Sequence, residues 1–183
     1  MRKLAILASV TLALTACGGS PTPQADSTPV LKVSANPASP QVGQKMTFNV
    51  GLMGGSGTWY VALFNQNPDG SVDQIYPNRL PDGQPTLTPG ATLNFPPQNA
   101  AYFVIAAEPL GIHKLLAYAS QKPIDPQQAG LSRYDSDQDS FATVTNPGDI
   151  LNGSFTAKLN LVYQGIFADT SYEVVRTPPA STP

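Results

Sequence analysis

The sequence is poor in the residues that most often build metal and redox sites. Its 183 residues include one cysteine and one histidine. A single cysteine excludes a disulfide framework within one chain and any zinc or redox site of the CxxC type. A single histidine excludes metal centres that need several imidazole ligands. The chemistry of this chain must therefore depend on other residue types.

Charge is also scarce. Charged residues make up 12% of the chain, well below the usual share for a soluble domain, and the formal net charge is −2. Lys and Arg form no extended run, so the sequence lacks the basic surface that nucleic acids require, and we expect no nucleic-acid partner. The hydrophobic share of 41% is near normal, which argues against disorder driven by charge.

Proline and glycine, by contrast, are abundant, with 19 and 15 residues. This composition favours turns, and frequent prolines prevent long helices. A folded part of about 150 residues can bury close to 70% of its unfolded surface, which is enough for one complete core. We therefore expect a single domain over residues 30–176 and a disordered tail over residues 177–183.

The first sixteen residues are typical of a signal peptide. Arg2 and Lys3 supply a positive start, and Leu4–Ala16 form an apolar stretch. That stretch is shorter than the roughly 20 residues that span a bilayer, so we expect it to be a cleaved signal and not an anchor. Its removal takes two of the ten basic residues and leaves eight against twelve acidic ones, a net charge of −4.

A short motif follows the apolar stretch. Leu14, Thr15, Ala16 and Cys17 resemble the lipobox of bacterial lipoproteins at all four positions. This resemblance implies cleavage before Cys17 and a thioether-linked diacylglycerol on its sulfur, with acyl chains such as palmitate. Two acyl chains hold a protein stably on a membrane, whereas one gives marginal binding. The alternative is an ordinary secretory signal followed by an incidental buried cysteine.

The residues after Cys17 are small, polar and proline-containing, as expected for a flexible tether over residues 17–29. Gly18 stands where an Asp would retain enterobacterial lipoproteins at the inner membrane. The resemblance thus implies a protein anchored on the outward face of a membrane, the outer membrane where one exists. We expect the membrane to be its first partner, through Cys17.

Alternating hydrophobicity indicates β-strands in the body of the chain. Lys45–Met53 and Ser154–Tyr163 alternate apolar and polar residues, and Leu31–Ala35 does so more briefly. Thr58–Asn65 and Ala101–Ala107 are apolar on both faces, which predicts central strands. Further strands are predicted at 71–76, 92–95, 112–119 and 172–176, with a hairpin turn at 67–70.

No convincing helix is present, although residues 126–131 can form a single helical turn. Eight or nine short strands at this spacing predict an all-β fold, a two-sheet antiparallel sandwich, with an open β-barrel as the alternative.

The middle of the chain resembles a bacterial family known as domain of unknown function 4384. The resemblance covers residues 57–124 and rests on strand and turn residues. They are Trp59-Tyr60-Val61, Asp69-Gly70, Ile75-Tyr76-Pro77-Asn78, Leu87-Thr88-Pro89-Gly90, Phe95-Pro96, Pro109-Leu110-Gly111, Leu115–Ser120 and Pro123-Ile124. The resemblance implies an extracytoplasmic module with no catalytic residues of its own.

Two segments are candidate chemical sites. His113 is the only imidazole, and it lies on a predicted strand where its side chain can face solvent. We assign it no catalytic role. Asp135, Asp137 and Asp139 alternate as in the opening of a calcium loop, but Ser140 replaces the glycine that an EF-hand requires. Two interpretations remain: a looser Ca²⁺ site, completed by Asp149 or by backbone carbonyls, and a solvated acidic loop.

Aromatic pairs offer a third candidate. Trp59, Tyr60 and Tyr102 can stack on a glycan, provided that one ring of each adjacent pair is exposed. Neighbouring residues on a strand face opposite sides, so one member of each pair is expected in the core.

We therefore expect a non-enzymatic binding or structural accessory module of the cell envelope, with an envelope protein or a glycan as further partner. The alternatives are a calcium-dependent adhesion or surface-layer accessory protein and a hydrolase with an unrecognised site.

Overall fold

The fold was obtained as a computed structural model, which describes residues 27–81, 83, 85–151 and 153–176. This part of the chain contains eleven strands and one helix. In chain order they are β1 (Val30–Asn36), β2 (Lys45–Met53), β3 (Trp59–Gln66), β4 (Val72–Tyr76), β5 (Thr86–Leu87), β6 (Thr92–Phe95), β7 (Val104–Ile105), β8 (Gly111–Ser120), β9 (Ser132–Arg133), β10 (Ala142–Val144), α1 (Ser154–Tyr163) and β11 (Ile166–Val174).

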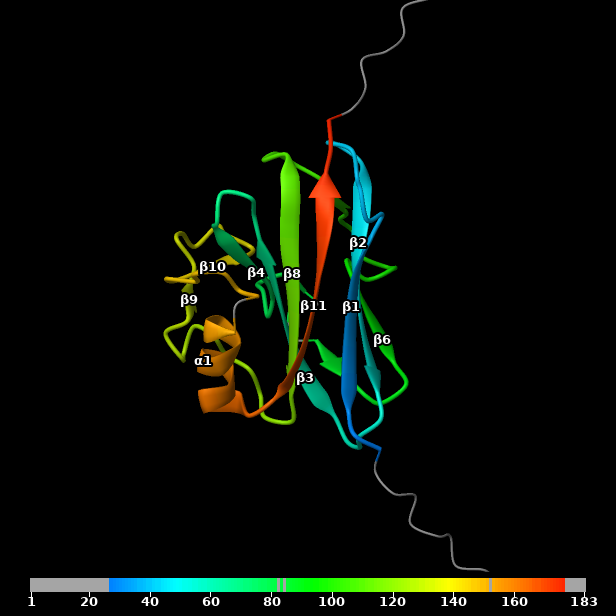
Figure 1. Ribbon diagram of the computed structural model, residues 1–183, viewed down its shortest axis with the longest axis vertical. Coiled ribbons are helices and arrows are strands. Elements are labelled where there is room, and N and C mark those ends of the chain that lie inside the picture. The colour runs from blue at the N-terminus through cyan, green and yellow to red at the C-terminus, as the bar shows by residue number, and fades with distance from the viewer. Residues whose placement is uncertain (1–26, 82, 84, 152, 177–183) are drawn as a thin grey trace, which may run out of the picture.

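The strands form two antiparallel sheets that pack face to face. The smaller sheet has the order β1-β2-β6, with β7 also paired to β2. The larger sheet has the order β11-β8-β3-β4-β10-β9, with β5 also paired to β3. Figure 1 shows the two sheets side by side and α1 on the far side of the larger sheet. The predicted all-β sandwich is confirmed, and the described strands do not close into a barrel.

The main core lies between the two sheets. β2 contributes the four apolar residues that its alternation predicted, Met46, Phe48, Val50 and Leu52, all of which are buried. Opposite them lie inward residues of the larger sheet, including Val61, Leu63, Leu115 and Ala117. Burial of these side chains is the main favourable term in closing the sandwich.

A second core covers the outer face of the larger sheet. Ala62 and Phe64 of β3 and Leu116 and Tyr118 of β8 point outward and pack under α1 and the loops before it. This arrangement explains why residues 58–65 are apolar on both faces: β3 is a central strand with a core on each side. The prediction of a central strand there is confirmed.

The segment Ser154–Tyr163 is a helix, so our prediction of a strand was wrong. Its buried residues are Phe155, Thr156, Leu159 and Tyr163, which lie on one helical face, whereas Leu161 is 84% exposed. The alternation that predicted a strand includes Phe155, Leu159 and Tyr163, and these three residues are also spaced four apart, as on one face of a helix. Gln164 adopts a left-handed conformation at the C-terminal end, where its N–H donates to Asn160 O, and such residues commonly close helices.

The prediction of a central strand at Ala101–Ala107 was also wrong. Only Val104–Ile105 forms a strand, and it pairs with the start of β2 at one edge of the smaller sheet. Phe103 is 60% exposed there, and the Lys45 ammonium lies 4.1 Å from the centre of its ring. Apolar composition alone did not separate an edge segment from a central strand.

The two sheets are joined along one side by backbone hydrogen bonds to the end of β11. Glu173 N–H donates to Ala38 O, and Val175 N–H donates to Pro40 O, each at 3.0 Å. Figure 1 shows β1 beginning at one end of the long axis and β11 ending at the other. The described chain therefore enters and leaves at opposite ends of the body.

Candidate functional site

Three predicted features fall outside the described residues. The signal peptide and Cys17 lie in residues 1–26, and the tail covers residues 177–183. In the part of the chain that the structure describes, no helix has the length and apolar character needed to cross a membrane.

The three aspartates of the predicted calcium loop do not converge. Asp135 accepts hydrogen bonds from Arg133 Nε at 3.0 Å and from Thr143 Oγ1 at 3.1 Å, and Asp139 accepts one from the Ser136 N–H at 2.7 Å. Asp137 is exposed between them. Across residues 27–81, 83, 85–151 and 153–176, no group of three or more His, Cys, Asp or Glu side chains is arranged to hold a metal ion.

The three candidate aromatic residues do not form one platform. Trp59 is buried between the sheets, where its indole N–H donates to Ser56 O at 3.1 Å. Tyr60 is half-buried on the opposite face of the same strand. Tyr102 is half-buried against Phe95, with 6.1 Å between the ring centres. The expectation that one member of the Trp59-Tyr60 pair lies in the main core is confirmed.

His113 does not face solvent, as we had expected that it can. It is 4% exposed and points into the space between the sheets. The reason is its register: His113 shares the inner face of β8 with Leu115 and Ala117, and it pairs with Tyr172 of β11. Its ring stacks on Tyr172, with 4.9 Å between the ring centres, and its Nε2 lies 3.0 Å from Pro109 O.

A hollow in the described surface lies elsewhere, over the outer face of the larger sheet. It has a volume of about 480 Å³ and is bordered by the end of β3, the β3–β4 turn, the start of β8 and the segment before α1. Its lining includes Gln66, Asn67, Ile112, Lys114, Gly148 and Asp149. These segments are distant in the sequence and meet because β3 and β8 are paired neighbours.

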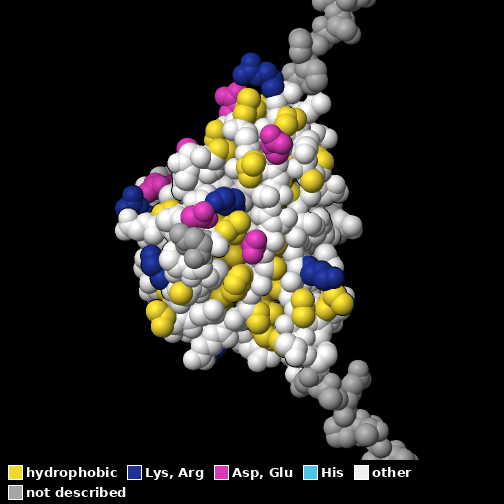
Figure 2. All heavy atoms as spheres, in the orientation of Figure 1, with side chains coloured by type: hydrophobic (Ala, Val, Ile, Leu, Met, Phe, Trp, Pro, Cys, Tyr) yellow, Lys and Arg dark blue, Asp and Glu magenta, His cyan; other side chains and the backbone are white. Residues whose placement is uncertain are grey.

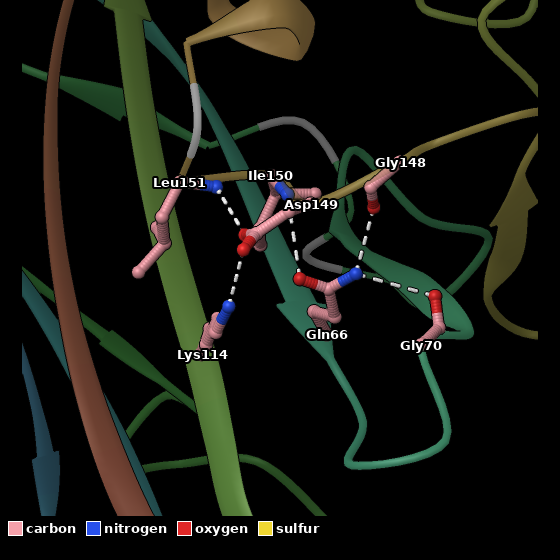
Figure 3. Close-up of polar contacts among 7 residues, drawn as sticks. All are labelled: Gln66, Gly70, Lys114, Gly148, Asp149, Ile150 and Leu151. Atoms are coloured by element: carbon pink, nitrogen blue, oxygen red, sulfur yellow. Dashed lines mark hydrogen bonds and ion pairs between the residues drawn. The ribbon is translucent and has the colours of Figure 1, made fainter.

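Gln66 organises the floor of this pocket. Its side chain is 6% exposed, and its Nε2 donates to Gly148 O at 2.8 Å and to Gly70 O at 3.3 Å. Its Oε1 accepts the N–H of Ile150 at 3.3 Å. Figure 3 shows these contacts running from one amide to the β3–β4 turn and to the segment before α1. A buried amide with all of these bonds made fixes both loops relative to the sheet.

Lys114 and Asp149 carry the charge of the pocket. Lys114 Nζ donates to Asp149 Oδ2 at 2.6 Å, and Asp149 Oδ1 accepts the N–H of Leu151 at 2.9 Å. The hydrogen bond from Lys114, followed by that from Leu151, lowers the pKa of the Asp149 carboxyl. Both side chains stay partly exposed, at 35% and 42%. A positive and a negative group thus stand side by side where a polar ligand can reach them.

Sequence reasoning missed this pocket. Asp149 was considered only as an additional calcium ligand, and neither Gln66 nor Lys114 was singled out. One signal was available: Gln66 is a polar residue at the end of an otherwise apolar strand, and buried amides are usually hydrogen-bonded for a structural reason.

Comparison with known proteins gives one match. Residues 40–123 match the family described as domain of unknown function DUF4384. This match confirms the resemblance seen at residues 57–124. The match begins earlier, at residue 40, and so includes β2. No curated protein and no solved structure matches the chain. The match thus covers the centre of the chain, from β2 to β8, with β1 before it and β9 to β11 after it.

Proposed function

We propose that this protein is a lipid-anchored, outward-facing module of the cell envelope that acts as a non-enzymatic binding or structural accessory. One observation carries the proposal: the Leu14-Thr15-Ala16-Cys17 motif directly follows a signal-like segment and precedes a small, polar stretch. A diacylated cysteine at that position anchors a protein stably, because two acyl chains contribute enough buried methylene groups.

The shape of the body supports a binding role at the end away from the anchor. Ser27 is ten residue steps after Cys17, a distance of at most about 36 Å when the chain is extended. β1 begins at the end of the body that this connection joins (Figure 1). The pocket of Gln66, Lys114 and Asp149 lies toward the other end, where β8 begins and β11 ends. In this arrangement the pocket is presented away from the membrane.

The surface supports binding of polar partners. Figure 2 shows few basic and acidic side chains on one face, several of them beside a side chain of the opposite charge, with hydrophobic side chains between them and no block of one sign. A surface of this kind offers hydrogen-bonding groups without the strong field that attracts polyanions. Envelope glycans and neighbouring envelope proteins are partners of the expected type.

The anchor can be tested directly with Cys17→Ala in the producing cells. We expect the wild-type protein to partition with membranes, to need detergent for extraction, and to carry the mass of a thioether-linked diacylglycerol. The Cys17→Ala protein should lack that mass and be extracted without detergent. Ser20→Ala, which changes the tether but leaves the motif intact, serves as the matched control and should behave like wild type.

A free, unmodified thiol on Cys17 of the wild-type protein contradicts the proposal. A Cys17→Ala protein that still needs detergent for extraction also contradicts the proposal, because its membrane association would then come from another part of the chain.

A further inference from the structure

The outer face of the smaller sheet carries uncharged polar side chains in register. On this face Ser34 of β1 is opposite Asn49 of β2, and Asn49 is opposite Asn94 of β6. Two residues further along, which is about 7 Å on a strand, Asn36 is opposite Thr47. Figure 1 shows this sheet on the side of the body away from α1, which covers the outer face of the larger sheet. The five side chains thus form a polar surface that α1 does not cover.

Three hollows adjoin one another on this face. The first has a volume of about 390 Å³ and lies over β1, β2 and the start of β6. Asn49 borders both this hollow and the second one, which has a volume of about 370 Å³. Pro97, Ala100 and Tyr102 border both the second hollow and the third, of about 380 Å³. The three hollows together form one groove, the sheet groove, which is long enough for an extended ligand.

Gly51 leaves a gap in the floor of this groove. It lies on β2, where it pairs with Lys32 on one side and Thr92 on the other. A glycine inside a strand weakens the strand, and it often marks a bulge or the close approach of a ligand. The register through Gly51 shows no shift toward either β1 or β6, so a bulge does not explain it.

The backbone of β2 does not explain Gly51 either. Its φ is not positive. A Cβ atom at this position would have one neighbour within 4 Å, Thr92 Oγ1 at 3.7 Å, which is an ordinary contact. The strand therefore tolerates a larger residue here, and the close approach of a ligand is the explanation that fits.

The sheet groove is almost free of charge. Lys32 is the only charged side chain among the described residues that border the three hollows, and it is exposed at one end. A polyanion would find a single opposite charge along the groove, and a cation would find none. Complementary charge gives binding sites much of their specificity, so this groove suits a neutral ligand.

The groove also offers hydrogen-bonding groups that are not used internally. The side-chain amides of Asn36, Asn49 and Asn94 make no hydrogen bond within the part of the chain that the structure describes. Each amide supplies two donors and one acceptor oxygen. A sugar hydroxyl group also donates and accepts, so a row of hydroxyl groups can pair with a row of amides.

The far end of the groove is apolar. Pro81, Pro97, Ala101 and Tyr102 border the third hollow. Tyr102 is half-buried and borders both the polar and the apolar parts of the groove. An aromatic ring of this kind combines an apolar face with a polar tip, which suits stacking on a sugar ring.

We propose that the sheet groove binds an uncharged oligosaccharide chain. The hydroxyl groups of the chain pair with Asn36, Asn49 and Asn94, and one sugar ring lies against Tyr102. Gly51 allows the chain to approach the backbone of β2. Of the three aromatic residues predicted to stack on a glycan, only Tyr102 belongs to this site.

This inference deepens the proposed binding role by naming a site and a ligand class, and it rests on that role. The sheet groove is separate from the pocket of Gln66, Lys114 and Asp149. Oligosaccharide binding does not require the lipid on Cys17. A missing lipid and a missing glycan site would therefore give different experimental results.

The test is a calorimetric titration of the purified full-length protein in a detergent without sugar headgroups. The probes are the hexasaccharides of β-1,4-linked N-acetylglucosamine, β-1,4-linked glucose and α-1,4-linked glucose. We expect at least one of them to bind saturably. The matching disaccharide should bind at least tenfold more weakly, because it covers only part of the groove. Hexagalacturonate, which carries a carboxylate on each ring, should also bind at least tenfold more weakly.

Variants locate the site. Gly51→Val should weaken binding of the hexasaccharide at least tenfold, because its side chain occupies the groove. Its melting temperature should stay near that of wild type, since valine favours strands and the position is open. Asn49→Ala and Asn94→Ala should each weaken binding about threefold to tenfold through a lost hydrogen bond. Ser171→Val is the control, because it adds bulk at an exposed position of β11 outside the groove, and it should bind as wild type does.

Three outcomes would overturn the proposal. The first is that none of the three hexasaccharides binds saturably. The second is that hexagalacturonate binds as tightly as the neutral chain. The third is that Gly51→Val, or both asparagine variants, bind as wild type does while they keep its melting temperature.

Discussion

The Lys114–Asp149 pair shows how single residues tune the outer pocket. The pKa of Asp149 is lowered below its usual 3.8, mainly by the hydrogen bond from Lys114. A carboxyl whose pKa is lowered by folding stabilises the folded state above its ordinary pKa. That contribution is lost as the pH falls through the lowered value. Both groups are partly exposed, so the contribution is on the order of 0.5 kcal/mol.

Lys114→Met should therefore raise the pKa of Asp149 toward its usual value. It should also lower the free energy of unfolding at pH 6, by an amount that shrinks as the pH drops below about 3.8. Carboxyl NMR and urea unfolding between pH 2 and 6 measure the two effects. Lys122→Met is the control, because Lys122 donates to the neutral Gln164 and should not alter Asp149. An unchanged Asp149 pKa in Lys114→Met would show that the ion pair is not formed in solution.

Gln66 shows why the pocket could not be predicted. Its partners Gly148 and Ile150 lie more than 80 residues away in the sequence. They meet only because the segment before α1 crosses the end of β3. Lys114 joins the same pocket because Gln66 and Lys114 are directly opposite in the β3–β8 register. Registers between distant strands are set by packing and turn geometry, which single-sequence patterns do not contain.

At the scale of elements, α1 is the clearest departure from the sequence prediction. A strand and a helix over residues 154–163 predict opposite exposures for the Leu161 side chain. In a strand, Leu161 and Phe155 share one face. In the helix, Phe155 packs edge-on against Phe64 at 4.9 Å between ring centres, while Leu161 is 84% exposed. Substitutions of Phe155 and Leu161 therefore distinguish the helix from the strand.

Phe155→Ala should destabilise the protein by about 3–5 kcal/mol, because it removes a buried ring and leaves a cavity in the second core. Leu161→Ala is the matched control and should change the free energy of unfolding by no more than about 0.5 kcal/mol. Thermal or urea unfolding measures both. Equal losses in the two variants would favour the strand that the alternation predicted.

Most of the sheet framework was predictable because its strands have clear local signals. β1, β2, β3, β4, β6 and β8 fall where alternation or dense apolar composition placed them. The hairpin at 67–70 is confirmed, with Gly70 at a φ of +88°, which glycine adopts without steric cost. β11 begins at Ile166, earlier than the predicted 172. Its first outward residue, Phe167, is apolar and its inward residue Thr170 is polar, so the start of the strand lacks a clear alternation.

At the scale of the whole molecule, β3 and β8 belong to both cores. Residues of these strands alternate between the space under α1 and the space between the sheets. Loss of packing in either core would expose β3 and β8. We therefore expect the described body to unfold as one cooperative unit.

Two probes test this expectation. Trp59 is the only tryptophan and reports on the main core, whereas the far-ultraviolet circular dichroism signal at 222 nm includes α1. In urea the two transitions should coincide in midpoint and slope. Loss of the helical signal at lower urea, with Trp59 fluorescence unchanged, would show that α1 and its core unfold separately.

The placement of the chain ends has a mechanical consequence. β1 starts at one pole and β11 finishes at the other, so tension between the ends acts along the strands (Figure 1). The ladders of β1 with β2 and of β11 with β8 extend over seven and nine paired positions. Such a load must break many inter-strand hydrogen bonds at the same time and cannot break them one after another. A body held at one pole and pulled at the other is thus oriented to resist force.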